Sequence, residues 1–243
     1  MKSRLLTITS ILAFMAIPFY SCSDGDVEVG GDCPQKKWIG HVFTPTTILE
    51  VVPKDRQMSI QGENINGKIV DVFQPYITGN FEVVAEFEKL YQTGASPTTA
   101  VPYVEMYIKN YSQPDSILDP TSVYCRVSPY GLVTIIGGNV TTHAFTLPYP
   151  TEYNGSIRVG RMNGKLIAKA IVGTDTLNTV VPATLSTTTQ QVGVRFGAEI
   201  IAPGSVVTTA GVKLNKFNVV SANDGTNLLS DEFLCKSISF ELP

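Results

Sequence analysis

The chain of 243 residues is poor in charged residues, histidine and tryptophan. Asp, Glu, Lys and Arg make up 16% of the chain, whereas the average is about 25%. There are two histidines and one tryptophan, and the formal net charge is −3 at pH 7. A nucleic-acid-binding domain needs a basic face, so this composition argues against a nucleic-acid partner.

Long apolar runs are also scarce, and one is present, at residues 5–20. It follows Lys2 and Arg4 and is interrupted by Pro18. It is shorter than the roughly 20 residues that a membrane-spanning helix needs. A short positive region followed by a short apolar region is the layout of a secretory signal. We therefore expect residues 1–21 to be a signal peptide.

The residues Phe19-Tyr20-Ser21-Cys22 end this apolar segment. They resemble the lipobox of bacterial lipoproteins, in which a small residue precedes the cysteine that becomes the new N-terminus. The resemblance implies acyl chains on the Cys22 sulfur and amine, and several chains together anchor a protein stably in a membrane. With Ser23 next, it implies an outer-membrane lipoprotein that faces either the periplasm or the cell exterior. A plain signal peptide with Cys22 as a structural thiol is the other interpretation.

Residues 22–33 are acidic and contain several glycines. Such a stretch buries almost no apolar surface, so we expect a flexible tether. Residues 34–243 are long enough for one sizeable core, which predicts a single domain.

Cysteine is sparse beyond Cys22. Cys33 precedes the predicted domain, Cys125 lies in a strand pattern, and Cys235 lies close to the C-terminal end. An exported protein can form disulfides, and three cysteines allow one bridge and one free thiol. We predict a bridge between Cys33 and Cys235, but other pairings stay open because sequence alone does not determine connectivity. Cys125 is predicted to be a buried, small apolar side chain.

Alternation of apolar and polar residues is abundant, and it is typical of β-strands. Residues 81–88 place apolar side chains on one face and glutamates on the other, and the same period recurs at 103–108, 123–127 and 192–196. Helical periodicity is almost absent beyond the signal. The chain is therefore predicted to be all-β, with an antiparallel sandwich as its architecture.

Asn163-Gly164 separates two such segments, SIRVGRM and KLIAKAIV. This pair is preferred in two-residue type I′ turns because both positions tolerate a positive φ. The turn predicts a hairpin whose register places Val159 opposite Ala168 and keeps apolar side chains together. The same register places Arg158 opposite Lys169, which is mildly unfavourable unless an acidic group lies nearby.

A family resemblance lies in the order of six segments, GNFEVVAEFE, YVEMYI, YCRVSPYG, GSIRVGRMNGKLIAKAIV, QVGVRFGAE and KLNKFNVVS. Together they resemble the concanavalin A-like lectin/glucanase (LamG-like) jelly roll over residues 57–220. The resemblance implies an antiparallel jelly-roll sandwich, and many relatives with that fold bind or cleave glycans. The matching segments are short and apolar, so they specify a fold rather than an activity.

Catalytic patterns are weak. The glucanase branch of this family carries a Glu-x-Asp-x-x-Glu strand, and the spacing of Glu82, Glu86 and Glu88 differs from it. A Ser-His-Asp triad would need His41 or His143, and neither lies in a nucleophile-elbow context. We expect the glutamates to form a solvated strand face and favour a non-catalytic role. A glycoside hydrolase with an unrecognised carboxylate pair stays open as an alternative.

No cofactor is expected from the sequence. The two histidines are far apart, and no Cys/His spacing indicates zinc. Asn223 and Asp224 could supply oxygen ligands to a structural calcium ion. However, the surrounding segment SANDGTN is rich in turn-forming residues, which favours a simple turn.

A binding face is better supported. Tyr103, Glu105 and Tyr107 point to one side of their predicted strand, and Tyr124 and Arg126 share that side if the two strands are neighbours. Aromatic rings can cover the apolar face of a sugar while charged groups bond its hydroxyls. The alternative is that these residues form cross-strand pairs that only stabilise the sheet.

These features together predict a lipid-anchored cell-envelope binding protein whose first candidate ligand is a glycan. Its predicted partners are the membrane, through the lipid, and a polysaccharide. A structural or assembly subunit of a surface complex is an alternative from another functional class, and it would expose an apolar patch.

Overall fold

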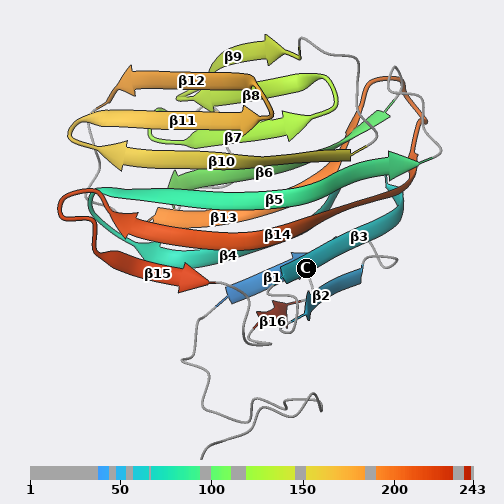
Figure 1. The fold of residues 1–243 in the computed structure, drawn as a ribbon, viewed down its shortest axis with the longest axis horizontal. Helices are drawn as coiled ribbons and strands as arrows, with labels where there is room; N and C mark the ends of the chain where they lie inside the picture. Colours follow the sequence, from blue (N-terminus) through green and yellow to red (C-terminus); the bar gives the residue numbers. More distant parts are fainter. Residues whose placement is uncertain are drawn as a thin grey trace, which may run out of the picture. The chain divides into compact units, whose positions relative to one another are not determined.

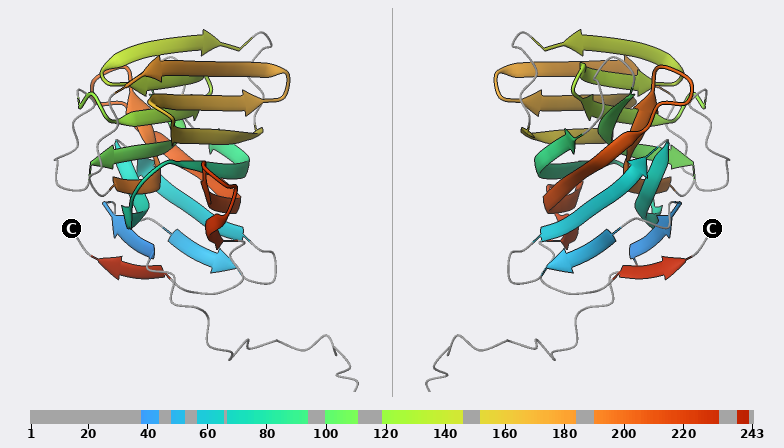
Figure 2. Two further views of the ribbon diagram at one scale, coloured as in Figure 1. Left: turned by 90° about the vertical axis from the view of Figure 1, so that its left-hand side faces the viewer. Right: turned by 90° about the vertical axis from the view of Figure 1, so that its right-hand side faces the viewer.

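The computed structural model describes residues 38–43, 48–52, 57–65, 67–93, 100–110, 119–145, 152–183, 190–231 and 238–241. These residues belong to one compact unit within residues 32–243 and form strands joined by turns. The strands build two sheets that pack face to face (Figures 1 and 2). The prediction of an all-β sandwich is confirmed.

Sheet A has eight strands, in the order β16 (Ile238–Glu241), β1 (Trp38–Val42), β4 (Lys68–Ile77), β13 (Gln190–Ile200), β6 (Ala100–Asn110), β7 (Val123–Ser128), β8 (Gly131–Ile136) and β9 (Asn139–Ala144). Sheet B has the order β12 (Asp175–Pro182), β11 (Lys165–Val172), β10 (Glu152–Met162), β5 (Phe81–Thr93), β14 (Val207–Ser221), β3 (Gln57–Ile65) and β2 (Ile48–Val52), with β15 (Asn227–Asp231) also paired to β14. Neighbouring strands are antiparallel except β1 and β16, which are parallel.

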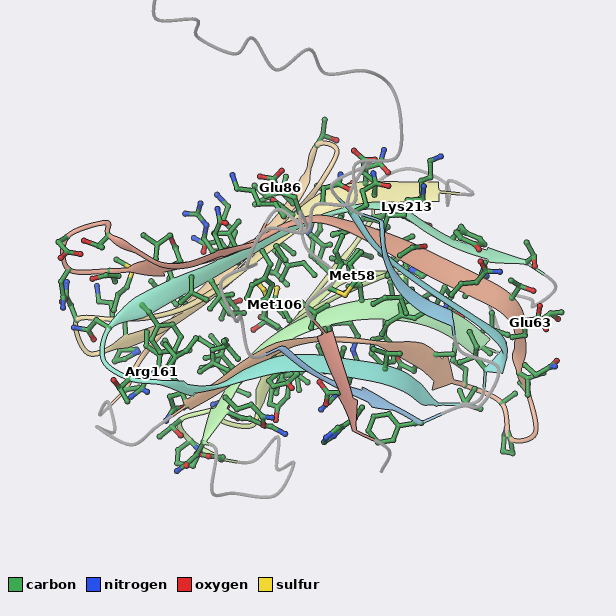
Figure 3. All side chains as sticks on the ribbon, turned by 90° about the horizontal axis from the view of Figure 1, so that it is seen from below. Met58, Glu63, Glu86, Met106, Arg161 and Lys213 are labelled. Carbon is green, nitrogen blue, oxygen red and sulfur yellow. The ribbon has the colours of Figure 1, made fainter. Side chains whose placement is uncertain are left out.

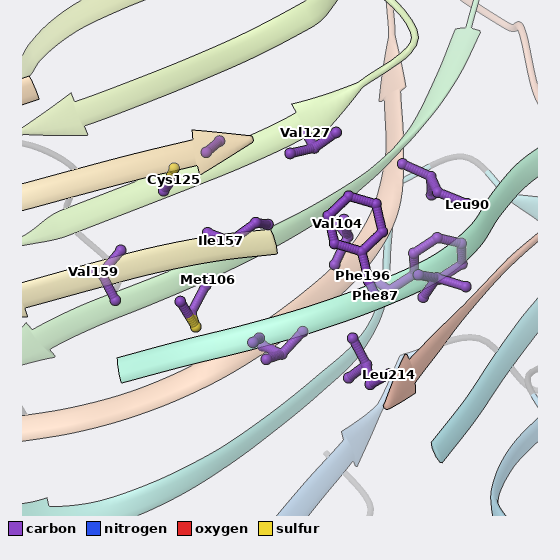
Figure 4. Packing of buried hydrophobic residues seen from close by; sticks show 14 of the residues in the cluster. Phe87, Leu90, Val104, Met106, Cys125, Val127, Ile157, Val159, Phe196 and Leu214 are labelled. Carbon is purple, nitrogen blue, oxygen red and sulfur yellow. The ribbon is translucent and has the colours of Figure 1, made fainter. Parts of the chain in front are cut away.

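The hydrophobic core lies between the two sheets. Alternation along β5 sends Phe81, Val83 and Phe87 inward, while Glu86 is exposed on the other side (Figure 3). From sheet A, Met106 and its neighbours meet the β5 side chains across the sandwich (Figure 4). Burying one such side chain stabilises the fold by about 1.5 to 3 kcal/mol, so the alternation read from the sequence is the main reason the two layers pack.

The hairpin between β10 and β11 has the predicted register. Val159 lies opposite Ala168, and Asn163 and Gly164 form the turn, with φ values of 45° and 74°. Arg158 lies opposite Lys169, as expected. An acidic group is supplied by β5, where Glu82 Oε1 lies 3.3 Å from Arg158 Nη1. The ion pair offsets the repulsion between the two cations.

Strand β14 is long and irregular. Its register against β5 shifts twice, between Gly211 and Lys213 and between Leu214 and Lys216. The strand begins at Val207, which is fully buried in the core opposite β3.

Cys125 is the free, buried cysteine of β7, and the prediction of a buried, small apolar residue is confirmed. Its side chain lies in the core between the sheets (Figure 4). Burial raises the pKa of the thiol, and the nearby Glu105 carboxylate raises it further. A thiol with a raised pKa holds little of the reactive thiolate.

We expect Cys125 to resist iodoacetamide in the folded protein at mildly alkaline pH and to react fully in concentrated urea. Peptide mass spectrometry would report Cys125 separately from the other cysteines. Equal alkylation of Cys125 with and without urea would contradict its position in the core.

Candidate functional site

The five residues predicted to form a binding face lie on two neighbouring strands of sheet A. Tyr107 on β6 is directly opposite Tyr124 on β7, and Glu105 is directly opposite Arg126. Tyr103 lies on the same side of β6, because alternate side chains share a face. These side chains point away from the core, on what we call the outer face of sheet A. The condition that β6 and β7 must be neighbours is therefore met.

Strands β13 and β4 extend this arrangement with residues that sequence reasoning did not assign to the site. Arg195 on β13 lies opposite both Glu105 and Asp71. Its Nη1 is 3.2 Å from Glu105 Oε1, and its Nη2 is 3.0 Å from Asp71 Oδ2. Arg126, Glu105, Arg195 and Asp71 thus alternate in charge across four adjacent strands, and we call them the charge row.

The sequence around Asp71 indicates that this residue has a partner in the folded protein. It is the one charged residue between Ile69 and Phe73, in the strand segment KIVDVF, and a charge in an apolar strand needs a partner. The sequence alone does not identify this partner, because Arg195 is 124 residues away in the chain.

Arg126 is held at three points. Its Nε and Nη2 donate to Glu105 Oε2 at 2.9 and 2.8 Å, and its Nη1 donates to Glu199 Oε2 at 3.3 Å. The guanidinium carbon lies 4.1 Å from the centre of the Tyr103 ring, in a cation–π contact. Burial alone would lower the pKa of Arg126, but the attraction of these groups outweighs it and the net shift is upward. The guanidinium is therefore charged and fixed in direction.

The tyrosines are part of the same network. Tyr107 donates its hydroxyl hydrogen to Asp71 Oδ1 at 2.6 Å, and Arg195 lies over the Tyr107 ring at 5.1 Å. The rings of Tyr107 and Tyr124 are 6.0 Å apart. Burial, followed by the charge of Glu105, raises the pKa of Tyr103 to about 12. Tyr103 thus acts as an aromatic surface and not as a phenolate.

The Tyr107→Phe variant is expected to lower the free energy of unfolding by about 1.5 to 3 kcal/mol, the range for a hydrogen bond to a charged group. The reason is that the buried Asp71 carboxylate loses a short hydrogen bond while the ring is kept. Urea unfolding would measure the change. Tyr91→Phe, at a half-buried tyrosine of β5, serves as the control. Equal effects of the two changes would argue against the Tyr107–Asp71 bond.

The outer face is much less open than alternation alone predicts. Tyr107 and Tyr124 are no more than 1% exposed, Glu105 is 1% exposed, and Tyr103 and Arg195 are below 9%. Four of the five residues predicted to form the binding face, Tyr103, Glu105, Tyr107 and Tyr124, are therefore buried, and Arg126 is partly exposed. Buried charges are stable only when paired and hydrogen-bonded, and the cross-strand register gives each charge an opposite neighbour.

One edge of the outer face is accessible. The side chains of Arg126 and Glu199 are 23% and 51% exposed. Val133 on β8 lies directly opposite Arg126 and is half-buried. Ile135 follows on the same side of β8, opposite Val140 of β9, which is 60% exposed. We call Arg126, Glu199 and Tyr103 the Arg126 edge, and Val133, Ile135 and Val140 the aliphatic shelf.

The outer face also brings two carboxylates together, as a glycoside hydrolase would require. Asp71 and Glu105 both contact the guanidinium of Arg195. A retaining glycosidase needs one carboxyl group as a nucleophile and another as an acid. Here both carboxylates are bound in buried ion pairs, and this engagement favours a structural role for them.

The glutamates of β5 behave as a solvated strand face, as expected. Glu82 pairs with Arg158, and Glu86 lies 3.9 Å from Lys216 on β14. Both contacts lie on the outer side of sheet B, away from the charge row.

The two histidines lie on different strands of sheet A, His41 on β1 and His143 on β9. His143 Nε2 is 3.0 Å from Asp175 Oδ1 on β12, so this contact links an edge of sheet A to an edge of sheet B. The hydroxyls of Thr134 and Thr179 are 2.7 Å apart and make a second link between the sheets. These contacts close the sandwich along one side.

The segment weighed as a calcium site forms the turn between β14 and β15. Asp224 accepts a hydrogen bond from the backbone N–H of Thr226 at 3.0 Å, and this bond lowers the pKa of the carboxyl group. Asn223 accepts one from Asn80 Nδ2 at 3.1 Å. Among the described residues, no group of three or more His, Cys, Asp or Glu side chains is placed to hold a metal ion.

Several predicted features lie outside the described residues. They are Cys22, the pair Cys33 and Cys235, the signal at 1–21 and the tether at 22–33. They stay predictions. In the part of the chain that the structure describes, no helix has the length and apolar character needed to cross a bilayer.

Comparison with known proteins gives a fold and no family. No protein family and no curated protein matches the chain. A solved structure titled "Sialidase" aligns with a TM-score of 0.50 and 8% identity over 77% of this chain and 17% of its own. A lectin from Bauhinia forficata in complex with GalNAc has a TM-score of 0.47 and 13% identity over 77% of this chain and 94% of its own. An alginate lyase from Corynebacterium sp. has a TM-score of 0.46 and 12% identity over 73% and 82%.

At these identities the likeness concerns the fold alone. This chain aligns with 17% of the sialidase chain, so the activity of that whole protein is not carried over. The fold is the concanavalin A-like jelly roll, as predicted. A fold of this kind hosts many unrelated functions, so it specifies no activity for this chain.

Proposed function

We propose that this protein is a non-catalytic, carbohydrate-binding protein of the bacterial cell envelope, anchored in the outer membrane by lipid on Cys22. The observation that carries the binding role is the Arg126 edge. There, a partly exposed guanidinium is fixed against Tyr103 by Glu105 and Glu199. A site that is already ordered loses little side-chain entropy when a ligand binds.

The Arg126 edge has hydrogen-bonding capacity left for a ligand. A guanidinium has five N–H donors, and the contacts to Glu105 and Glu199 engage three of them. Glu199 is half exposed and offers acceptor oxygens beside the remaining donors. A donor next to an acceptor matches neighbouring sugar hydroxyls, each of which can accept and donate.

A glycan-array measurement on the full-length chain in detergent tests this proposal. We expect saturable binding by the unaltered protein and at least tenfold weaker binding by Arg126→Gln. Arg158→Gln is the matched control, because Arg158 also pairs with a glutamate on an outer strand face, but in sheet B. Circular dichroism would verify that both variants fold. Failure of the unaltered protein to bind any glycan would sink the binding role and favour a structural subunit of a surface complex.

The lipid anchor needs its own experiment. In a bacterial host fed an alkyne-tagged fatty acid, the chain is expected to take up the label and to fractionate with the outer membrane. Cys22→Ser should abolish the labelling. A label-free but exported protein would instead support the plain signal peptide with Cys22 as a thiol.

A further inference from the structure

The outer face of sheet B is open to solvent, whereas the outer face of sheet A is largely buried. On sheet B the side chains of Glu86 and Arg158 are 51% and 47% exposed. Glu86 and Lys213 both point away from the core on this side (Figure 3). A ligand can therefore reach this face directly, and Tyr91 of β5 belongs to it.

A β-bulge turns Tyr91 toward this outer face. Phe87 lies in the core, and strict alternation would place residue 91 in the core as well. Instead, Leu90 is fully buried in the core and Tyr91 is half-buried on the other side. The register shifts here against both neighbouring strands, and Lys89 has a φ of 51° while donating its backbone N–H to Asn154 Oδ1 at 2.8 Å. Bulges re-aim side chains, and strained backbone positions concentrate at functional sites.

The tip of the Tyr91 side chain lies over Gly211 of the adjacent strand β14. The two residues are cross-strand partners. A Cβ atom on Gly211 would lie 2.7 Å from the ring atom Cε1 and 3.0 Å from the hydroxyl oxygen, so a larger residue would displace the ring. The glycine thus leaves the space in which the ring is held against the sheet. Partial burial raises the pKa of Tyr91, which keeps its hydroxyl protonated at neutral pH.

Polar side chains surround this ring. Gln61 on β3 is the cross-strand partner of Gly211, so it lies next to the tip of Tyr91. Lys213 and Glu88 are partners of each other, two residues or about 7 Å farther along β14. Gln61, Lys213 and Glu88 are all half-buried. They offer an amide, a cation and a carboxylate whose charges sum to zero, which favours a neutral ligand rich in hydroxyl groups.

We propose that Tyr91 is the stacking surface of a second binding site, which takes one neutral pyranose unit of a glycan. The apolar C–H face of the sugar lies on the exposed part of the ring, and its hydroxyls bond Gln61, Lys213 and Glu88. This inference rests on the proposed carbohydrate-binding function and adds a site on the sheet opposite the Arg126 edge. A single hexose is expected to bind here with a Kd on the order of 1 mM, too weakly for the glycan array to register.

Saturation-transfer difference NMR on the full-length Arg126→Gln chain in detergent tests this site, because that background removes the Arg126 edge. The probes are methyl β-glucoside, methyl β-galactoside and methyl α-mannoside, with the open-chain polyol sorbitol as the matched ligand that lacks a ring face. At least one pyranoside is expected to bind about fivefold more tightly than sorbitol or better. Irradiation of the aromatic protons should transfer saturation to the ring C–H protons of that sugar.

Four further variants in the same background locate the effect. Tyr91→Ala should weaken pyranoside binding about fivefold or more, and Tyr91→Phe should stay within about twofold because the ring is kept. Gly211→Ala should also weaken binding, since the added Cβ atom moves the ring. Tyr130→Ala is the control, because Tyr130 is also half-buried but lies between β7 and β8 of sheet A. Circular dichroism would verify that each variant folds.

Either of two results would overturn the inference. One is that none of the pyranosides binds more tightly than sorbitol, and the other is that Tyr91→Ala binds as tightly as Tyr130→Ala. Both results leave the Arg126 edge and its array test untouched. Conversely, an unaltered protein that binds no glycan on the array, but keeps Tyr91-dependent pyranoside binding, would remove the Arg126 edge and retain this second site.

Discussion

Replacing Arg195 by methionine is expected to lower the free energy of unfolding by about 3 to 5 kcal/mol, the range observed when one partner of a buried ion pair is removed. Arg195 bridges the carboxylates of Asp71 and Glu105 in surroundings where all three are less than 9% exposed. Methionine fills similar space but leaves Asp71 without its guanidinium. Urea denaturation followed by circular dichroism would measure the loss.

Arg158→Met, which breaks an exposed pair with Glu82, should cost no more than about 1 kcal/mol. Equal losses for the two variants would contradict a buried charge row.

Replacing Gly131 by alanine is expected to destabilise the protein by about 3 to 5 kcal/mol. Gly131 has a φ of 136°, which side-chain-bearing residues rarely adopt. A Cβ atom at this position would also overlap the backbone oxygen of His143 on the adjacent strand β9. Because that oxygen belongs to the backbone, the overlap is removed only if strands β8 and β9 move apart.

Thermal unfolding would test the Gly131→Ala variant, with Gly67→Ala as the matched control. A Cβ atom at Gly67 meets no other atom within 4 Å, so the control should stay within about 0.5 kcal/mol of the unaltered protein. A Gly131→Ala protein as stable as the control would show that the β8–β9 pairing tolerates the added atom.

The sequence by itself determined the local features of this protein. Alternation of apolar and polar residues predicts the fold class and the inward faces of β5, β6 and β7. The Asn163-Gly164 turn predicts the register of the β10–β11 hairpin. Such signals are contained within about ten consecutive residues. They specify which side chains share a face, and they placed Tyr103, Glu105 and Tyr107 together correctly.

Only the tertiary structure decided which strands are neighbours and how deeply each face is buried. The charge row depends on β13 lying between β6 and β4, which brings Arg195 beside Glu105 and Asp71 from 90 and 124 residues away. Alternation is the same for a solvated face and for a covered one, so it could not distinguish the buried Tyr107 from the accessible Arg126 edge. The burial of a side chain results from contacts with segments distant in the chain, so no short stretch of sequence determines it.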